Sequence, residues 1–439
     1  MRTVIVGAGP TGMFLAMSLA RRGHSVTLVD RDPGPAADDQ WNRRGVMQFR
    51  HPHFFRPQVR DALLAEVPEV AARLVEAGAL PTPLSPAMPE FLGLRMRRLT
   101  FERVLRAAAV AEPGVTTVVG NASHVRVDRH RVRGVVVDGR TIEADLVIDA
   151  SGRAGRFADG LRAPGVGQDS GFAYVSREYQ LLPDAEPGPL NSPPGWGGIY
   201  HGYLVIIFVQ DASTFQVLIV RPADDRELAR LRHDDVFDTA TQEIPSIAAW
   251  VDPERAKPNG PTMVGGHLLN AYRGQLGSDG RPAAEGILFV GDAVLTTNPA
   301  AGRGVSTSLM HARHVLAALD EHGTDLAAVA GDVDQWCTST LRPWYDDHVA
   351  WDAGLLSRWR GEDVDLDQPL PSDLICSLAE ADQSVMPIVG AYQAMLAGPS
   401  VLAQIEERAR ANLRSGFRPS VPDGPTRDEL AARIARVGS

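Results

Sequence analysis

The chain has 439 residues, more than one ordinary compact domain contains, so we expect two or three packed units. Hydrophobic residues make up 44% of the chain and charged residues 22%, which is typical of a globular protein with a sizeable core. The formal net charge of −10 argues against a surface that binds nucleic acid or an anionic membrane. No stretch approaches the ~18 apolar residues of a membrane span. The amino terminus carries no recognisable signal peptide, so a soluble, cytoplasmic protein is expected.

A glycine-rich turn joins the first predicted strand to the first predicted helix. The pattern predicts a short buried strand at residues 3–6, a helix at 10–22 that ends before Gly23, and a second strand at 25–29. A βαβ unit of this kind predicts a parallel central sheet. The turn itself reads Gly7-Ala8-Gly9-Pro10-Thr11-Gly12, and Asp30 follows the second strand.

Each glycine of this turn has its own role in binding a dinucleotide. Gly7 permits the tight turn, Gly9 lets a pyrophosphate approach the backbone, and Gly12 lets the helix pack closely on the strand. The helix amino terminus offers free N–H groups and a positive dipole end to phosphates. Asp30 stands near the separation expected for an acid that binds a ribose hydroxyl. The motif therefore predicts dinucleotide binding, with a purely structural turn as the alternative, and does not separate FAD from NAD.

A second glycine motif lies far along the chain. A predicted strand at 287–290 runs into Gly291-Asp292-Ala293 and then into the loop 298–304, which reads Asn-Pro-Ala-Ala-Gly-Arg-Gly. From Val305 onward apolar residues recur at helical spacing. This arrangement resembles the second FAD fingerprint of the flavoprotein monooxygenase superfamily. The resemblance implies that Asp292 bonds the ribityl chain and that the loop lies beside the flavin ring. There a helix amino terminus can stabilise the negative charge of a reduced flavin.

Two further stretches resemble the same superfamily. Arg98, Phe101 and Leu105 match a helix whose arginine approaches the FAD phosphates, with a surface arginine as the alternative. Asp149 opens the run Asp-Ala-Ser-Gly-Arg, which stands where group A hydroxylases carry an Asp-Gly motif tied to FAD and NADPH. This departure weakens the prediction of direct NADPH binding and slightly favours a separate flavin reductase.

Residues 44–53 narrow the resemblance to one branch. They read Arg-Gly-Val-Met-Gln-Phe-Arg-His-Pro-His, which resembles a segment of FAD-dependent epoxidases and halogenase-like proteins, with methionine in place of a proline. Arg44 could reach the cofactor or could be a simple loop arginine. His51 and His53 could act as catalytic acids, although lining of the flavin pocket is the default expectation. We expect no metal here, because no cysteine or carboxylate cluster accompanies the two histidines.

The complete set of predicted site residues combines these segments. The expected cofactor-binding residues are Gly7, Gly9, Pro10, Thr11, Gly12, Asp30, Arg31, Arg44, Gln48, Arg98, Asp149, Gly291, Asp292, Pro299, Gly302, Gly304 and Val305. The expected flavin-facing catalytic candidates are Pro299, Gly302, Arg303 and Gly304, together with His51 and His53.

Residues 170–270 show a different sequence pattern, in which apolar and polar side chains alternate. Segments 199–210 and 214–221 predict a hairpin with its turn at 211–212, and so an antiparallel sheet that covers the flavin. Four aromatic residues could line a substrate pocket or form ordinary sheet core: Trp196, Tyr200, Tyr203 and Phe208. The last hundred residues are predicted helical, and the final helix begins with a capping box at Thr426 and Glu429.

The expected fold class is α/β, with a Rossmann-like FAD-binding domain built on a parallel central sheet. This domain is predicted to be discontinuous, at residues 1–65, 97–165 and 270–325. An antiparallel-sheet substrate domain is predicted at 66–96 and 166–269, and a helical carboxy-terminal region at 326–439. Cys337 and Cys376 match no zinc or redox spacing and are expected to be reduced thiols.

The resemblance implies an FAD-dependent monooxygenase of the kind found in secondary metabolism. In that superfamily reduced FAD adds O2 to form a C4a-hydroperoxide, which passes one oxygen atom to a small molecule. We expect an apolar or aromatic substrate and either epoxidation or hydroxylation. Electrons would come from NAD(P)H, directly or through a separate flavin reductase. The cofactor supplies the difficult chemistry, so no acid–base dyad is needed.

Three functions are alternatives to the monooxygenase reaction. Halogenation is disfavoured, because related halogenases use a lysine near the substrate, whereas Lys257 is the only lysine and no Trp-x-Trp-x-Ile-Pro motif is present. Oxidase, dehydrogenase or reductase chemistry on the same scaffold is the main rival. A flavin-loaded binding or sensor protein is the non-enzymatic alternative. The sequence does not identify the substrate.

Overall fold

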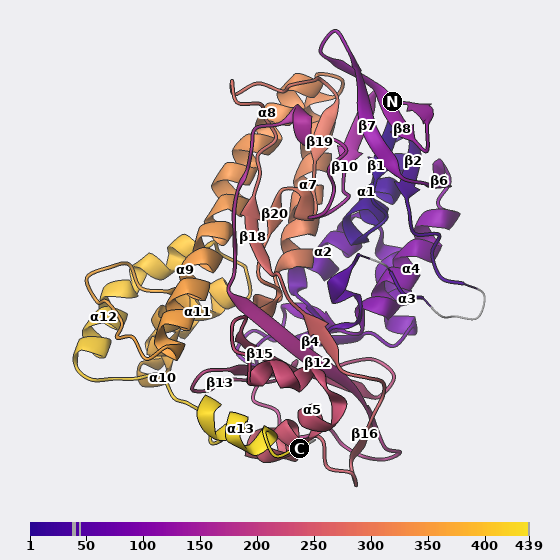
Figure 1. Ribbon diagram of the computed structural model, residues 1–439. Helices are drawn as coiled ribbons and strands as arrows, with labels where there is room; N and C mark the ends of the chain where they lie inside the picture. Colours follow the sequence, from indigo (N-terminus) through magenta and orange to yellow (C-terminus); the bar gives the residue numbers. More distant parts are fainter. Residues whose placement is uncertain (37–40, 44, 438–439) are drawn as a thin grey trace.

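The computed structural model describes residues 1–36, 41–43 and 45–437, so Arg44, a predicted cofactor contact, lies outside the described residues. The centre of the first layer is a five-stranded parallel sheet (Figure 1). Its strands, in the order β19-β10-β1-β2-β6, are β19 (Ile287–Phe289), β10 (Leu146–Asp149), β1 (Arg2–Val6), β2 (Ser25–Asp30) and β6 (Val115–Val119). The predicted α/β class and parallel sheet are confirmed.

Helices cover this sheet and begin where the glycine motifs predict. Pro10 occupies the first turn of α1, where its missing N–H costs nothing, and the helix ends just before Gly23 at φ +83°. The helices of this layer are α1 (Pro10–Arg21), α2 (Pro57–Glu66), α3 (Pro68–Glu76), α4 (Arg98–Ala111) and α7 (Gly304–His322).

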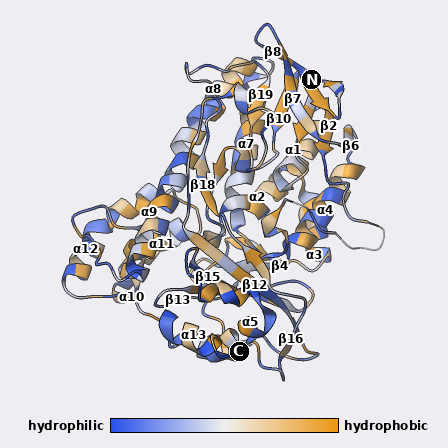
Figure 2. Ribbon diagram, viewed as in Figure 1, coloured by the Kyte–Doolittle hydropathy of each residue, from blue (hydrophilic) through white to orange (hydrophobic). Residues whose placement is uncertain are grey.

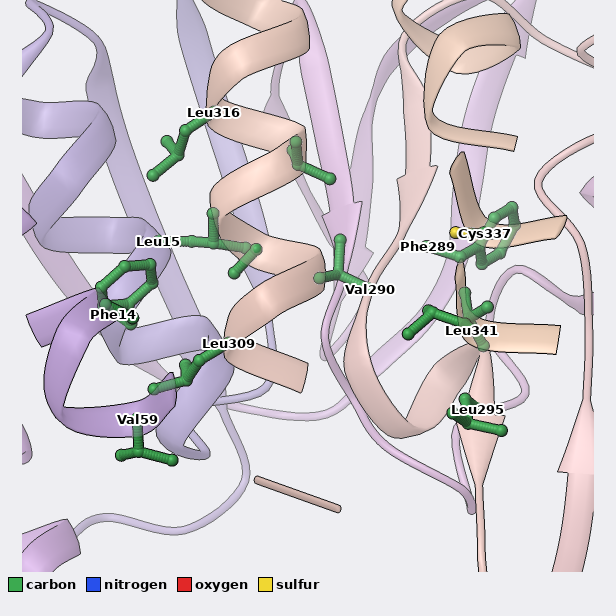
Figure 3. Close-up of a cluster of buried hydrophobic side chains, with 14 of the residues drawn as sticks. Phe14, Leu15, Val59, Phe289, Val290, Leu295, Leu309, Leu316, Cys337 and Leu341 are labelled. Atoms are coloured by element: carbon green, nitrogen blue, oxygen red, sulfur yellow. The ribbon is translucent and has the colours of Figure 1, made fainter. Parts of the chain in front are cut away.

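One continuous apolar core joins the two glycine motifs (Figure 3). Phe14 and Leu15 of α1 pack in the same cluster as Leu309 and Leu316 of α7. Val290, at the end of β19, belongs to it as well. Burial of this area supplies the main driving force for bringing the distant segments together.

Three small sheets accompany the two large ones. The first holds β3 (Phe54–Phe55), β5 (Leu92–Arg95) and β4 (Leu80–Pro83); the second holds β7 (Ala122–Asp128), β8 (Arg131–Val137) and β9 (Arg140–Glu143). The third holds β11 (Val166–Asp169), β18 (Leu269–Tyr272) and β20 (Leu295–Thr296), and it links the parallel sheet to the second large layer.

The second layer is a six-stranded antiparallel sheet. It consists of β13 (Gly195–Ile199), β14 (Leu204–Val209), β15 (Thr214–Pro222), β12 (Phe172–Leu181) and β16 (Ala256–Pro258), with β17 (Met263–Gly265) paired to β12. The predicted hairpin is confirmed by the antiparallel pairing of β14 with β15. The expected strand at 199–210 is nevertheless split, because Gly202 adopts φ +95° and turns the chain between β13 and β14.

The aromatic residues of this sheet separate onto its two faces. Trp196, Tyr200 and Tyr203 pack in a core with Leu430 of the last helix, and the rings of Tyr200 and Tyr203 stack with centroids 4.7 Å apart. Of the two alternatives left open by the sequence, these three residues take the ordinary core position and do not line the pocket. Phe208 lies on the other face, towards a cavity. Along β14 the side chains alternate, so Phe208 faces the cavity while its neighbours Ile207 and Val209 face the core.

The carboxy-terminal region is helical, as predicted. The remaining helices are α5 (Asp234–Glu243), α6 (Pro245–Ala248), α8 (Leu326–Trp336), α9 (Arg342–Trp359), α10 (Ser372–Ala381), α11 (Met386–Gln393), α12 (Glu406–Arg414) and α13 (Arg427–Ile434). Helix α13 carries the predicted capping box and lies beside α5, away from α9 to α12 (Figure 1).

The hydropathy of the elements (Figure 2) and the state of the cysteines fit the predicted globular fold. Apolar colour concentrates on the strands, whereas α12 and α13 show long hydrophilic stretches (Figure 2). Cys337 and Cys376 are both free thiols. Among the helices that the structure describes, none is both long and apolar enough to cross a lipid bilayer.

The close approach of α1 to the first turn generates a stability prediction. A Cβ atom at Gly12 would lie 1.8 Å from the carbonyl oxygen of Gly7, whereas a Cβ at Gly331 in α8 would meet nothing within 4 Å. Helix propensity alone favours alanine over glycine by ~1 kcal/mol. We expect Gly331→Ala to stabilise the fold and Gly12→Ala to destabilise it by about 1–3 kcal/mol in chemical unfolding. Equal stabilisation by both variants would contradict the close approach.

Candidate functional site

A cavity of about 600 Å³ lies between the parallel sheet and the six-stranded sheet. The carboxyl ends of all five parallel strands line it, through Gly7, Asp30, Gly120, Ala150 and Val290. In open α/β sheets ligands bind at this edge, outside the carboxyl ends of the strands. The opposite wall is formed by side chains of the six-stranded sheet, namely Tyr174, Ile206, Phe208 and Leu218.

Most of the predicted site residues meet in this cavity. Those that line it are Gly7, Gly9, Pro10, Thr11, Asp30, Arg31, Gln48, His51, His53, Arg98, Asp292, Pro299, Gly302, Gly304 and Val305. Gly12, Asp149, Gly291 and Arg303 are not part of the lining. The two glycine motifs, far apart in sequence, therefore form one site.

The glycines of the two motifs serve different purposes. A Cβ at Gly7, which has φ +109°, would lie 2.3 Å from the carbonyl oxygen of Ala150, so the protein itself requires glycine there. Around Gly9 the nearest atom to a Cβ is an Arg43 nitrogen at 4.0 Å, and around Gly302 and Gly304 nothing lies within 4 Å. These three positions leave open space on the cavity side, where a bound group can approach the backbone.

The amino termini of two helices lie at the cavity wall. Helix α1 begins at Pro10 and α7 begins at Gly304, and both of these residues line the cavity. The positive ends of the helix dipoles favour an anionic ligand. Arginine side chains add to this positive field: Arg31, Arg43, Arg98, Arg153 and Arg156.

A buried ion-pair network lies beside the first glycine turn. Asp30 accepts hydrogen bonds from the Ala8 backbone N–H at 2.6 Å and from Arg43 at 2.7 Å. Arg43 also pairs with Glu102, which in turn accepts from Arg98. Burial alone would lower the pKa of Arg43, but the carboxylates of Glu102 and Asp30 outweigh it and raise that pKa. The network holds Asp30 at the cavity edge with its charge compensated.

Sequence reasoning missed Arg43 and Glu102. Its candidate from this segment was Arg44, which lies outside the described residues, and no local signal marked Arg43 as buried. Glu102 carried a weak signal: it lies four residues after Arg98 on the predicted helix, and its side chain is 0% exposed in the structure. A buried carboxylate requires a cationic partner, and that partner comes from a distant loop.

The two acidic residues of the predicted motifs occupy different positions. Asp292 faces the cavity; burial raises the pKa of its carboxyl, and Arg98 and Arg153 oppose that rise. Asp149 is buried beneath the cavity and accepts hydrogen bonds from the backbone N–H and the hydroxyl of Ser151. Asp149 therefore shapes the turn after β10 from behind the cavity wall.

His51 and His53 both line the cavity as neutral imidazoles. Nδ1 of His51 lies 2.7 Å from the hydroxyl of Ser176, and its ring meets the ring of Tyr174 edge-on at 4.7 Å. Nδ1 of His53 lies 2.8 Å from the carbonyl oxygen of His51 and so donates to it. Burial lowers the pKa of His51 to about 4, and burial together with Arg98 lowers that of His53 to about 3.

Arg303 differs from its expected position. It was predicted to face the flavin, but it points away from the cavity and donates to Asp347 at 2.8 Å. Its guanidinium lies over the rings of Trp344 and Tyr392, at 4.4 and 4.8 Å. The cause is Gly302, whose left-handed conformation (φ +62°) turns the chain before α7 starts. The loop thus presents glycine and proline to the cavity and its arginine to the carboxy-terminal helices.

Protonation of the two cavity histidines can be tested directly. We expect His51 and His53 to remain neutral in NMR spectra of their ring nitrogens down to about pH 5, with the exposed His130 as the internal reference. Because their pKa values are lower in the folded than in the unfolded chain, acid should weaken the fold as pH falls below ~6.5. Protonation of either ring at pH 6 would contradict their burial.

Comparison with known proteins gives matches to two family models and short stretches of sequence similarity to curated proteins. Residues 2–92 match the family model described as FAD dependent oxidoreductase, and residues 56–164 match the tryptophan halogenase model. A D-amino acid dehydrogenase from Rhizobium johnstonii is 43% identical over 49 residues. That match covers 11% of this chain and only 12% of the relative's length.

Solved structures resemble nearly the whole chain at low sequence identity. The flavin-dependent brominase Bmp2 is similar with a TM-score of 0.65 and 16% identity, covering 94% of this chain and 99% of that one. The anhydrotetracycline hydroxylase OxyS from Streptomyces rimosus is similar with a TM-score of 0.60 and 16% identity, covering 92% and 75%. These matches confirm the predicted resemblance: the chain has the fold of flavin-dependent monooxygenases and halogenases, and its amino-terminal segment matches the FAD dependent oxidoreductase family.

Proposed function

We propose that the cavity binds FAD and that the protein inserts one oxygen atom into an apolar or aromatic small molecule, by epoxidation or hydroxylation. The observation that carries the proposal is the meeting of both glycine motifs with an apolar sheet wall in one cavity. The cavity volume of about 600 Å³ is within the range of cofactor and ligand sites.

The residues present fit FAD along the whole length of the cavity. Gly9, the amino terminus of α1 and Arg98 would hold the pyrophosphate, and Asp30 would bind the adenosine ribose. Asp292 would bond the ribityl chain. The open backbone at Gly302 and Gly304 would lie against the flavin ring, since no protein atom occupies the space that their Cβ atoms would take.

An orphaned polar atom also supports a bound group. The Tyr174 side chain is 2% exposed, and its hydroxyl has no hydrogen-bond partner among the described residues. Burial raises the pKa of this phenol, so it stays protonated and can donate. A buried donor without a partner is costly, and a polar atom of the cofactor or substrate would relieve that cost.

The chain's own residues prepare the site for the reaction. Bound FAD, once reduced, supplies the activation of O2. The amino terminus of α7, at the cavity wall, would stabilise negative charge on a group bound there. Ile206, Phe208 and Leu218 exclude water and orient an apolar substrate from the opposite wall. The electrons would come from NAD(P)H, directly or through a partner flavin reductase.

Halogenation is the second candidate, favoured by the match of residues 56–164 and by the likeness to Bmp2. Lys257 does not support it, because it lies exposed on edge strand β16 and is not part of the cavity lining. Oxidase or dehydrogenase chemistry is the third candidate, favoured by the match of residues 2–92 and by the short likeness to a D-amino acid dehydrogenase.

The reaction type can be decided with labelled oxygen. We expect the purified protein to show a flavin absorbance spectrum that bleaches anaerobically with NAD(P)H, alone or with an added flavin reductase. A panel of aromatic and alkene compounds with ¹⁸O2 should then give a product carrying one labelled oxygen, without need for halide. A brominated or chlorinated product would favour the halogenase, and stoichiometric H2O2 with an unlabelled product would favour the oxidase.

The cofactor assignment has its own mutational test. Gly9→Val should abolish FAD binding by filling the space left for the pyrophosphate, whereas Gly160→Val, at an exposed glycine with open surroundings, should not. Asp292→Ala should raise the FAD dissociation constant about 10- to 100-fold, as expected for loss of a charge-assisted hydrogen bond. The exposed Asp279→Ala is its control. A Gly9→Val protein fully loaded with FAD would refute the assignment of the first motif.

A further inference from the structure

The cavity loop at 298–302 is held from behind by helix α9. Asp352 of α9 is 2% exposed and accepts two hydrogen bonds from amide side chains. Its Oδ1 accepts from Nδ2 of Asn298 at 2.9 Å, and its Oδ2 accepts from Nδ2 of Asn270 at 2.7 Å. Asn298 opens the loop and Asn270 lies on β18, so one carboxylate ties three distant segments together.

The backbone fixes the orientation of both asparagine amides. Oδ1 of Asn270 accepts the backbone N–H of Asn298 at 2.7 Å, and Oδ1 of Asn298 accepts the backbone N–H of Ala300 at 3.1 Å. Neither amide can flip without losing its bond to a backbone N–H group. Both therefore present their NH2 groups to Asp352, and only a side chain that accepts on both oxygens satisfies them.

Burial of a charge at this position has a cost that the hydrogen bonds from the two amides reduce. Burial raises the pKa of Asp352 to about 7, whereas the bonds from Asn270 and Asn298 oppose the rise. A protonated acid would turn one of its two acceptors into a donor that faces an NH2 group. An asparagine at 352 would do the same with an amide group, although its size and shape match those of aspartate.

Two further contacts hold the same loop from the same side. Arg56, just before α2, donates to the carbonyl oxygens of Ala301 at 2.8 Å and Gly302 at 3.2 Å. Arg303 is anchored to Asp347, which like Asp352 belongs to α9. The cavity side of the loop remains open at Gly302. The loop is thus supported on its rear face and free on its front face.

We propose that Asp352 is a positioning residue: its carboxylate, through Asn298 and Asn270, holds the 298–302 loop in the conformation that receives the flavin ring. This inference rests on the proposed FAD site. It gives the carboxy-terminal helices a role in cofactor geometry, although Asp352 itself does not line the cavity.

The test compares Asp352→Asn with Asp346→Asn, a matched change at an exposed position on the same helix. Hydrogen–deuterium exchange of residues 298–304 is measured in the full chain, with and without added FAD. We expect loop exchange to be at least about tenfold faster in Asp352→Asn, because one of the two hydrogen bonds is lost and a donor then faces an NH2 group. Its FAD dissociation constant should rise about tenfold, and the visible circular dichroism of the bound flavin should change. Asp346→Asn should match the wild type in all three measurements.

A reciprocal exchange separates positioning from general destabilisation. In the double variant Asn298→Asp with Asp352→Asn, the donor and acceptor change places, so that both amide groups again meet an acceptor. Slow loop exchange and tight FAD binding should return. If Asp352→Asn fails to fold, the double variant still tests the proposal, because the proposal requires the double variant to fold and to bind FAD.

Several results would overturn the inference. One is hydrogen exchange of the loop in Asp352→Asn that is as slow as in the wild type. Another is faster hydrogen exchange with unchanged FAD affinity and unchanged flavin dichroism. The third is a double variant that restores neither slow hydrogen exchange nor tight FAD binding. Failure of the proposed function gives a different result: the wild-type chain would bind no FAD, while the loop exchange measured without FAD would still report on Asp352.

Discussion

The parallel pairing of β1, β10 and β19 is the constraint on which the site depends. Val6 pairs with Asp149, and Asp149 pairs with Phe289, so the three strands end at the same level. The turns that follow them must therefore share one edge of the sheet. There the backbone at Gly7 comes so close to Ala150 that no side chain fits between them. The cavity is the space left in front of these turns.

Positive potential in this space comes from fixed and well-supported groups. Two helix termini contribute partial charges, and Arg43 and Arg98 contribute full charges that are paired with buried carboxylates. Arg43 illustrates the arrangement, because it is 6% exposed and lies between Asp30 and Glu102. Pairing keeps such charges buried without an uncompensated desolvation cost. The result is a rigid polar end of the cavity opposite an apolar wall.

The carboxy-terminal helices add a third kind of support. Asp347 and Asp352 lie five residues apart on α9, and both reach the loop that begins α7, one through Arg303 and the other through Asn298. A loop rich in glycine is intrinsically mobile, since glycine loses much conformational freedom on folding. Contacts on its rear face can restrict it while the front face stays open. Stability of the carboxy-terminal region and geometry of the cavity are in this way linked.

The sequence by itself determined the elements whose causes are local. The glycine turn, the first helix with Pro10, the strand before Asp292 and the capping box at Thr426 all follow from backbone conformation and short-range hydrogen bonding. Only the tertiary structure decided that Arg43 is buried between two carboxylates and that Trp196 packs in the core. It also decided that Asp352 bonds to Asn298, more than 50 residues away. These outcomes depend on contacts between segments distant in sequence, and no local pattern of residues encodes such contacts.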